Sequence, residues 1–150
     1  MSRPLSWSDF KGEVIDGIGL SGEIFCMNLA NFEKKNALVK TTYSVVSVFD
    51  RNKSWVDPKI KTSHGLMYFQ VTFDIYEVHA RKLRKDLSEA DFGSDPNQQF
   101  QQKYNASMTE LTQEFNSFRK ETKMGSVMGE LKKWRIKIDE ELKQLESYKN

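Results

Sequence analysis

The spacing of apolar residues divides the chain into a β-rich first third and a helical remainder. From residue 37 to residue 50, β-branched and aromatic residues alternate with polar ones, which predicts a half-buried strand. A weaker strand is predicted over residues 23–29. From Leu66 to Leu87 the apolar residues recur at steps of three and four, a period typical of an amphipathic helix.

Two further helices are predicted after that one. The second begins at Pro96 with Asp95 as its N-cap, because an Asp followed by Pro at the first helical position is a common helix start. Gly125 interrupts the helical pattern, and a third apolar stripe follows within residues 126–148. The predicted fold is therefore α+β, an N-terminal antiparallel β-sheet followed by three helices in a single domain over residues 1–150.

Composition narrows the classes of partner. Lys and Arg number 23 and Asp and Glu 21, so the sequence offers no sustained basic field for nucleic acid. No apolar run approaches the roughly 20 residues that a membrane-spanning helix needs. The start of the chain carries no secretory signal, which predicts either a cytoplasmic protein or a mature, processed form. Cys26 is the only cysteine, and its apolar neighbours indicate a small buried residue rather than a nucleophile.

Separated segments of the chain share a pattern with one known family. Residues 5–12 read Leu-Ser-Trp-Ser-Asp-Phe-Lys-Gly, residues 54–56 read Ser-Trp-Val, and residues 73–84 read Phe-Asp-Ile-Tyr-Glu-Val-His-Ala-Arg-Lys-Leu-Arg. Residues 121–125 read Glu-Thr-Lys-Met-Gly, and a helical pattern containing Trp134 follows. In this order they resemble a family of predicted secreted zinc-dependent proteases of the His-Glu-x-x-His type. The resemblance implies a zincin-like fold, a zinc cofactor and an extracytoplasmic (periplasmic or secreted) bacterial protein.

The departures from the family pattern fall at the positions that bind zinc and activate water. The resemblance aligns the first histidine with Tyr68, the general-base glutamate with Phe69, the second histidine with Thr72 and a later histidine with Met124. A phenol and a hydroxyl are poor zinc ligands at neutral pH, and a thioether suits softer metals. A phenyl ring has no proton to transfer. We therefore expect that zinc binding and hydrolysis have been lost and that these degenerate positions are not catalytic.

Other residues near this motif have a structural and a functional interpretation. Asp74 and Glu77 match positions that the family keeps beside its metal, so they are candidates for second-shell residues or for polar contacts with the C-terminal helices. Trp55 is a candidate for a groove wall or a core position. His64 and His79, the only histidines, are predicted to be ordinary surface or boundary residues, since a helix would separate them by roughly 22 Å.

Three functions remain open at this point. The first is an inactive homologue of a secreted metallopeptidase that retains a groove for a peptide or protein. The second is a structural or assembly protein whose former active site has collapsed into the core. The third is a hydrolase with a rebuilt metal site, for which Glu77 and His79 are the candidate ligands. Neither the partner nor the oligomeric state can be inferred from the sequence.

Overall fold

The computed structural model describes residues 3–15, 17, 20–33 and 42–150. Residues 37–41 of the predicted strand lie outside this part of the chain. The strands are β1 (Gly22–Glu23), β2 (Cys26–Glu33), β3 (Thr42–Phe49) and β4 (Trp55–Val56), and the α-helices are α1 (Ser63–Ser88), α2 (Pro96–Glu121) and α3 (Met128–Gln144). Short 3₁₀ helices are formed by Trp7–Asp9, Pro58–Ile60 and Glu146–Tyr148.

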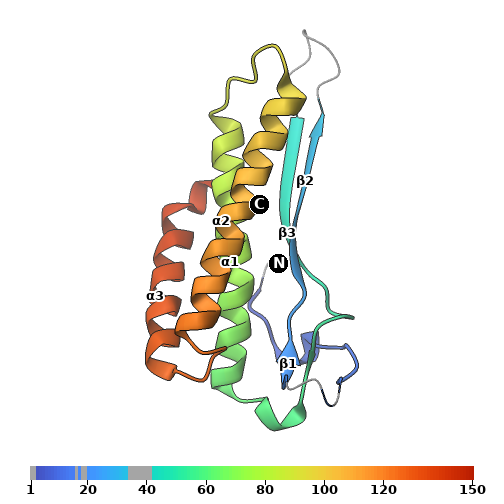
Figure 1. The fold of residues 1–150 in the computed structure, drawn as a ribbon, viewed down its shortest axis with the longest axis vertical. Coiled ribbons are helices and arrows are strands. Elements are labelled where there is room, and N and C mark those ends of the chain that lie inside the picture. Colours follow the sequence, from blue (N-terminus) through green and yellow to red (C-terminus); the bar gives the residue numbers. More distant parts are fainter. Residues whose placement is uncertain (1–2, 16, 18–19, 34–41) are drawn as a thin grey trace.

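The predicted α+β class is confirmed, with one difference in the strands. Instead of one sheet, the described strands form two separate antiparallel pairs, β1 with β4 and β2 with β3. In Figure 1 the helices run roughly parallel to the long axis and cover one face of the long β2–β3 ribbon, while β1 lies at the lower end. The molecule is thus a helical layer on a β layer, with the short β1–β4 pair beside the start of α1.

Local sequence signals account for the helix ends. The Asp95 side chain accepts a hydrogen bond from the Gln98 amide at 3.1 Å, and Pro96 occupies the first helical position, as predicted. Thr62 caps α1 in the same way, accepting from the Gly65 amide at 3.0 Å. None of the described helices combines the length and the apolar character needed to cross a bilayer.

The long helix α1 is buried on two sides. The predicted stripe packs its later part, with Ala80, Leu83 and Leu87, against Val45 of β3. A second apolar set, Val71, Ile75 and Val78, packs against α2 and α3 around Leu111, Phe118, Leu131, Trp134 and Ile138. α1 thus contacts the other two helices of its own layer and both strands of the ribbon.

Candidate functional site

A cavity of about 770 Å³ lies at the end of the molecule where α1 begins. Residues 20–26 form one wall, the start of α1 forms the second, and the end of α2 with the following turn forms the third. Tyr68, Phe69 and Met124, three of the four positions that the resemblance aligns with zinc-binding or catalytic residues, border this cavity. Although they come from segments far apart in the sequence, the fold thus gathers them around one hollow.

The turn between α2 and α3 has an unusual backbone. Lys123, Met124 and Gly125 all have positive φ, at 45°, 54° and 90°, a conformation that is costly for the two residues with a Cβ atom. Side chains from the end of α2 and from the start of α1 hold the turn in place. The Thr122 hydroxyl accepts from the Gly125 amide at 3.2 Å, and the His64 ring hydrogen-bonds the Gly125 carbonyl. The turn is therefore a fixed part of the cavity wall.

Tyr68 forms the centre of the wall contributed by α1. Its ring stacks on Phe118 at 5.1 Å between centroids and meets Phe69 edge-on at 5.6 Å. Burial raises the pKa of the Tyr68 phenol, and the charge of nearby Arg119 opposes this only in part. The phenol therefore stays protonated at neutral pH and serves as a hydrogen-bonding group rather than an anionic ligand.

Phe69 and Thr72 are committed to packing and to the helix itself. Phe69 is 3% exposed, and its ring packs against Phe10 at 5.0 Å between centroids while its edge reaches the cavity. Thr72 is 1% exposed, and its hydroxyl donates to the Tyr68 carbonyl at 3.0 Å. The helix backbone thus takes up the Thr72 hydroxyl, which is not among the described groups that border the cavity.

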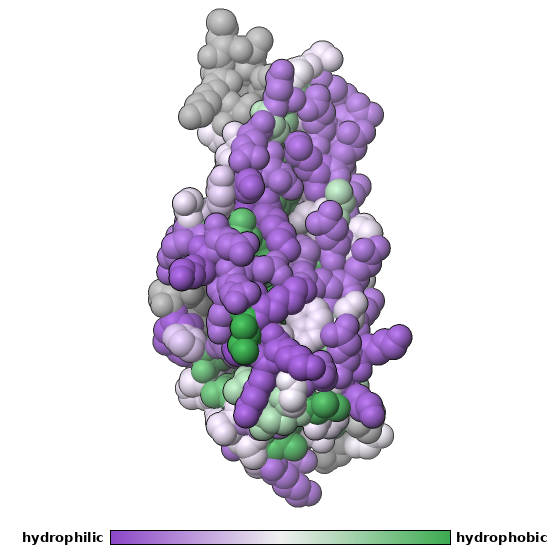
Figure 2. Space-filling model, turned by 90° about the vertical axis from the view of Figure 1, so that its left-hand side faces the viewer, coloured by the Kyte–Doolittle hydropathy of each residue, from purple (hydrophilic) through white to green (hydrophobic). Residues whose placement is uncertain are grey.

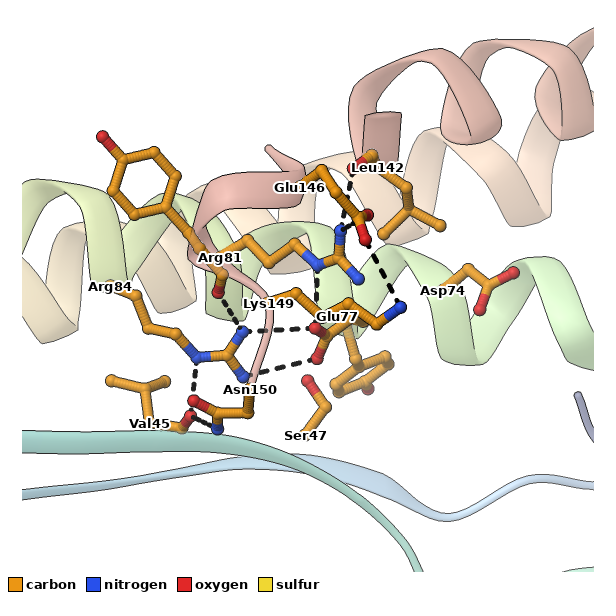
Figure 3. A network of polar contacts seen from close by, with 12 residues as sticks. Val45, Ser47, Asp74, Glu77, Arg81, Arg84, Leu142, Glu146, Lys149 and Asn150 are labelled. Carbon is orange, nitrogen blue, oxygen red and sulfur yellow. Dashed lines mark hydrogen bonds and ion pairs between the residues drawn. The ribbon is translucent and has the colours of Figure 1, made fainter. Parts of the chain in front are cut away.

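Glu77 holds a buried ion-pair network, shown in Figure 3. Its carboxylate accepts from Arg81 at 2.9 Å and from Arg84 at 3.2 Å. Arg84 also donates to the Val45 carbonyl of β3 at 2.8 Å and to the Tyr148 carbonyl at 2.7 Å. The network therefore ties α1 both to the ribbon and to the segment after α3, and it lies away from the cavity described above.

Asp74 makes a similar link to α3. Arg135 donates to its carboxylate at 2.6 Å, and the Gln70 amide donates to it at 2.8 Å. Burial raises the pKa of Asp74, although the Arg135 charge favours the ionised form. Asp74 and Glu77 thus both contact basic side chains of the helical layer.

His79 lies deep in the helical layer, so the prediction of a surface or boundary position was wrong for this residue. It is 2% exposed, and its Nε2 atom lies 2.7 Å from a carboxylate oxygen of Glu114 on α2. Glu114 also pairs with Lys137 of α3. Glu114 gives the buried imidazole a partner at Nε2, whereas Nδ1 is buried without a hydrogen-bond partner among the described residues. His79 and Glu114 border a separate polar groove of about 650 Å³.

Trp55 is 1% exposed and pairs with Glu23 between β1 and β4. Trp55 belongs to β4, the strand that pairs with β1, and β1 is part of the first cavity wall. Trp55, Asp74, Glu77 and His79 are all absent from the described lining of that cavity. Within the described residues, no group of three or more His, Cys, Asp and Glu side chains is arranged to hold a metal ion.

Sequence reasoning missed the part of the site that α2 contributes. Phe115 and Arg119 both border the cavity, and the Arg119 guanidinium lies 5.5 Å from the Phe115 ring centroid. Their spacing of four residues places them on one side of a helix, which was a usable signal. Cys26 also borders the cavity and is half-buried. Burial, followed by the Asp74 charge, raises the pKa of its thiol, so it is not an activated nucleophile.

Comparison of the chain with protein-family models, with curated proteins and with solved structures gave no significant match in any of the three. The function is therefore argued from the cavity and its surroundings.

Proposed function

We propose that the chain is a non-catalytic binding module, an inactive relative of zinc metallopeptidases that holds an extended peptide in the cavity beside Tyr68. The observation that carries this proposal is the open cavity of about 770 Å³ bordered by the degenerate positions Tyr68, Phe69 and Met124. A collapsed former site, as the structural alternative requires, would leave no such space. Ligand sites are typically hollows of this size with apolar walls and a few polar groups.

The first wall of the cavity supports binding of an extended chain. The Asp57 amide donates to the Ser21 carbonyl at 2.7 Å, next to the paired residues Gly22 and Val56. This bond shows which residues of the β1–β4 pair direct their backbone groups toward the partner strand. The alternation of an antiparallel ladder then turns the amide and carbonyl groups of Gly22 and Ile24 away from β4. Both residues border the cavity. A peptide strand placed there gains main-chain hydrogen bonds from this edge.

The surface around the turn supports the same function. Figure 2 shows a largely hydrophilic face whose apolar residues gather toward its lower end. In Figure 1 the α2–α3 turn lies at this same end of the molecule. Met124, within this turn, and Met128, the first residue of α3, are 47% and 41% exposed. Flexible thioether side chains adapt to varied apolar partners. They extend the apolar lining outward from the cavity, where a bound peptide would cover them.

The test is binding of an array of short synthetic peptides of diverse sequence, measured for the wild-type chain and two variants. Ser21→Trp places a ring at the cavity wall and leaves the backbone bond to Asp57 available. Ser44→Trp places the same ring on an exposed strand position of β3, away from the cavity. We expect Ser21→Trp to weaken binding by about tenfold or more and Ser44→Trp to leave it unchanged. Absence of any binding peptide, or equal binding by both variants, would overturn the proposal.

A further inference from the structure

The one arginine that borders the cavity has no carboxylate partner within the described residues. Arg119 borders the cavity and appears in none of the ion pairs found there. The other arginines each have a carboxylate close by: Arg3 and Arg51 pair with Asp9, Arg81 and Arg84 with Glu77, and Arg135 with Asp74. Among the residues that the structure describes, every guanidinium group except that of Arg119 thus has a carboxylate partner.

The surroundings of Arg119 hold it in position, with the Tyr68 phenol as a neutral hydrogen-bonding neighbour and no carboxylate among the described residues. The guanidinium lies 5.5 Å from the centroid of the Phe115 ring, a distance at which a cation is attracted to the ring face. The side-chain contact found for its Nη2 atom is the Met124 sulfur at 4.0 Å, which is a weak acceptor. A planar guanidinium has five N–H donors, more than these neutral neighbours take up, and its fork matches the two oxygens of a carboxylate.

The charge of the remaining lining favours an anion as well. Lys59 borders the cavity with Arg119, and Glu23 is the carboxylate on the described walls. Lys59, like Arg119, has no ion pair among the described residues. A peptide carboxylate therefore meets an excess of positive charge, and the partly apolar lining strengthens that attraction relative to water.

The length of the first wall distinguishes a side chain from a chain end as the source of the carboxylate. Residues 20–26 border the cavity in succession, and an extended stretch of that kind measures about 20 Å at roughly 3.3 Å per residue. A wall of this length accommodates a segment that passes through, and a carboxylate in its middle comes from an aspartate or glutamate.

From these contacts we infer that the module recognises an acidic peptide, and that Arg119 binds an aspartate or glutamate side chain within an extended, otherwise apolar segment. The inference rests on the proposed function, since it names the ligand class of the same cavity. It makes Arg119 a specificity-determining residue, with Phe115 positioning its side chain.

The test uses fluorescein-labelled peptide pools capped at both ends, in which one central position is Glu, Gln or Lys and the others vary among Val, Thr, Tyr and Ser. Affinity is measured by fluorescence polarisation. We expect the Glu pool to bind about tenfold more tightly than the Gln pool at low salt, with the difference shrinking as salt is added. Arg119→Gln should abolish this preference, and Arg119→Glu should transfer it to the Lys pool. Lys120→Gln removes the same charge from the neighbouring exposed position of α2 and should preserve the preference.

Each alternative outcome is distinct. Equal binding of the Glu and Gln pools, or a preference that survives Arg119→Gln, overturns the inference while leaving peptide binding intact. If the Gln pool gains Arg119-dependent affinity only when its C-terminus is left uncapped, the cavity recognises a chain end and the acidic-side-chain inference is wrong. Failure of every pool to bind overturns the proposed function and the inference with it. Circular dichroism of each variant checks that the fold is retained.

Discussion

The backbone of Gly125 lies so close to the ring of Tyr68 that a Cβ atom at this position would stand 2.9 Å from both Cγ and Cδ2 of the ring. Gly125 also has a φ of 90°, which side chains rarely allow. The contact locks the α2–α3 turn onto α1 and so fixes one wall of the cavity.

We expect Gly125→Ala to lower the free energy of unfolding by about 2 kcal/mol, because the added methyl group meets both the positive φ and the Tyr68 ring. Gly129→Ala is the matched control. Gly129 lies in α3 with nothing within 4 Å of an added Cβ, so alanine should raise stability by about 0.5–1 kcal/mol. Urea unfolding of the three proteins measures both effects. Equal stability of Gly125→Ala and wild type would contradict the tight contact.

The Glu77 network predicts a large cost for removing one charge. Burial alone would raise the pKa of Glu77, but hydrogen bonds from Arg81 and Arg84 outweigh it and the pKa is lowered. We expect Glu77→Gln to cost about 3 kcal/mol, since it leaves two largely buried guanidinium groups without their counter-charge. Glu130→Gln, which breaks an exposed pair with Lys133, should cost about 0.5 kcal/mol or less. If the two variants lose similar free energies of unfolding in urea, the Glu77 network contributes no more to stability than an exposed ion pair does.

Glu114 predicts how stability responds to acid. Burial alone would raise its pKa, but hydrogen bonds from His79 and Lys137 and the charges of Lys137 and Lys82 lower it to about 2. The pKa in the unfolded chain is about 4.3. Because the folded pKa is the lower one, the stabilisation is complete above about pH 4.3 and is lost as the pH falls toward 2.

Glu114→Gln should therefore remove part of the fall in unfolding free energy between about pH 4.5 and pH 2.5. Glu110→Gln is the control, because Glu110 lies one turn earlier on α2 and has no ion pair among the described residues. It should keep the wild-type dependence. Urea unfolding at a series of pH values measures all three proteins, and an unchanged slope in Glu114→Gln would refute the assigned role.

The sequence predicted the elements whose signals are local. The helix start at Asp95 and Pro96 depends on neighbouring residues alone, and so does the alternation that gave β3. The separate β1–β4 pair was not predicted, because it joins Gly22 and Glu23 to residues far along the chain. Strand partners are set by tertiary packing, which a local pattern does not contain.

The candidate site shows the same division between local and distant information. Tyr68 and Phe69 were singled out through their place in a motif, but the neighbours that give them a cavity come from β1 and α2. The burial of His79 followed from Glu114, which is 35 positions away, and could not be read from the helix that carries the histidine. Arg119 stood out only when the absence of a carboxylate beside it, among the described residues, could be compared with the ion pairs of the other arginines.

The proposed loss of the zinc site predicts that the protein does not take up zinc. Tyr68 remains protonated at neutral pH, Thr72 donates to the helix backbone, and Glu77 and His79 already bind other side chains. After dialysis against excess zinc and removal of free metal, we expect mass spectrometry to find far less than one zinc per chain. Stoichiometric zinc that disappears in Glu77→Gln or His79→Ala would instead support the rebuilt metal site and reopen the search for a hydrolase.

Cys26 offers a direct measure of the cavity, because it is the only cysteine and it borders the hollow. Alkylation by iodoacetamide requires the thiolate, and burial raises the thiol pKa, with a smaller contribution from the Asp74 charge. We expect the native protein to react at least about tenfold more slowly than the urea-unfolded chain at neutral pH, and its rate to keep rising with pH beyond the ordinary thiol range.

A peptide bound in the cavity should slow the reaction further, and Ser21→Trp should do so without peptide. Mass spectrometry follows the single adduct. Rapid alkylation of the native protein at neutral pH would contradict the buried, protonated thiol, and unchanged protection by a tightly binding peptide would place that peptide elsewhere on the surface.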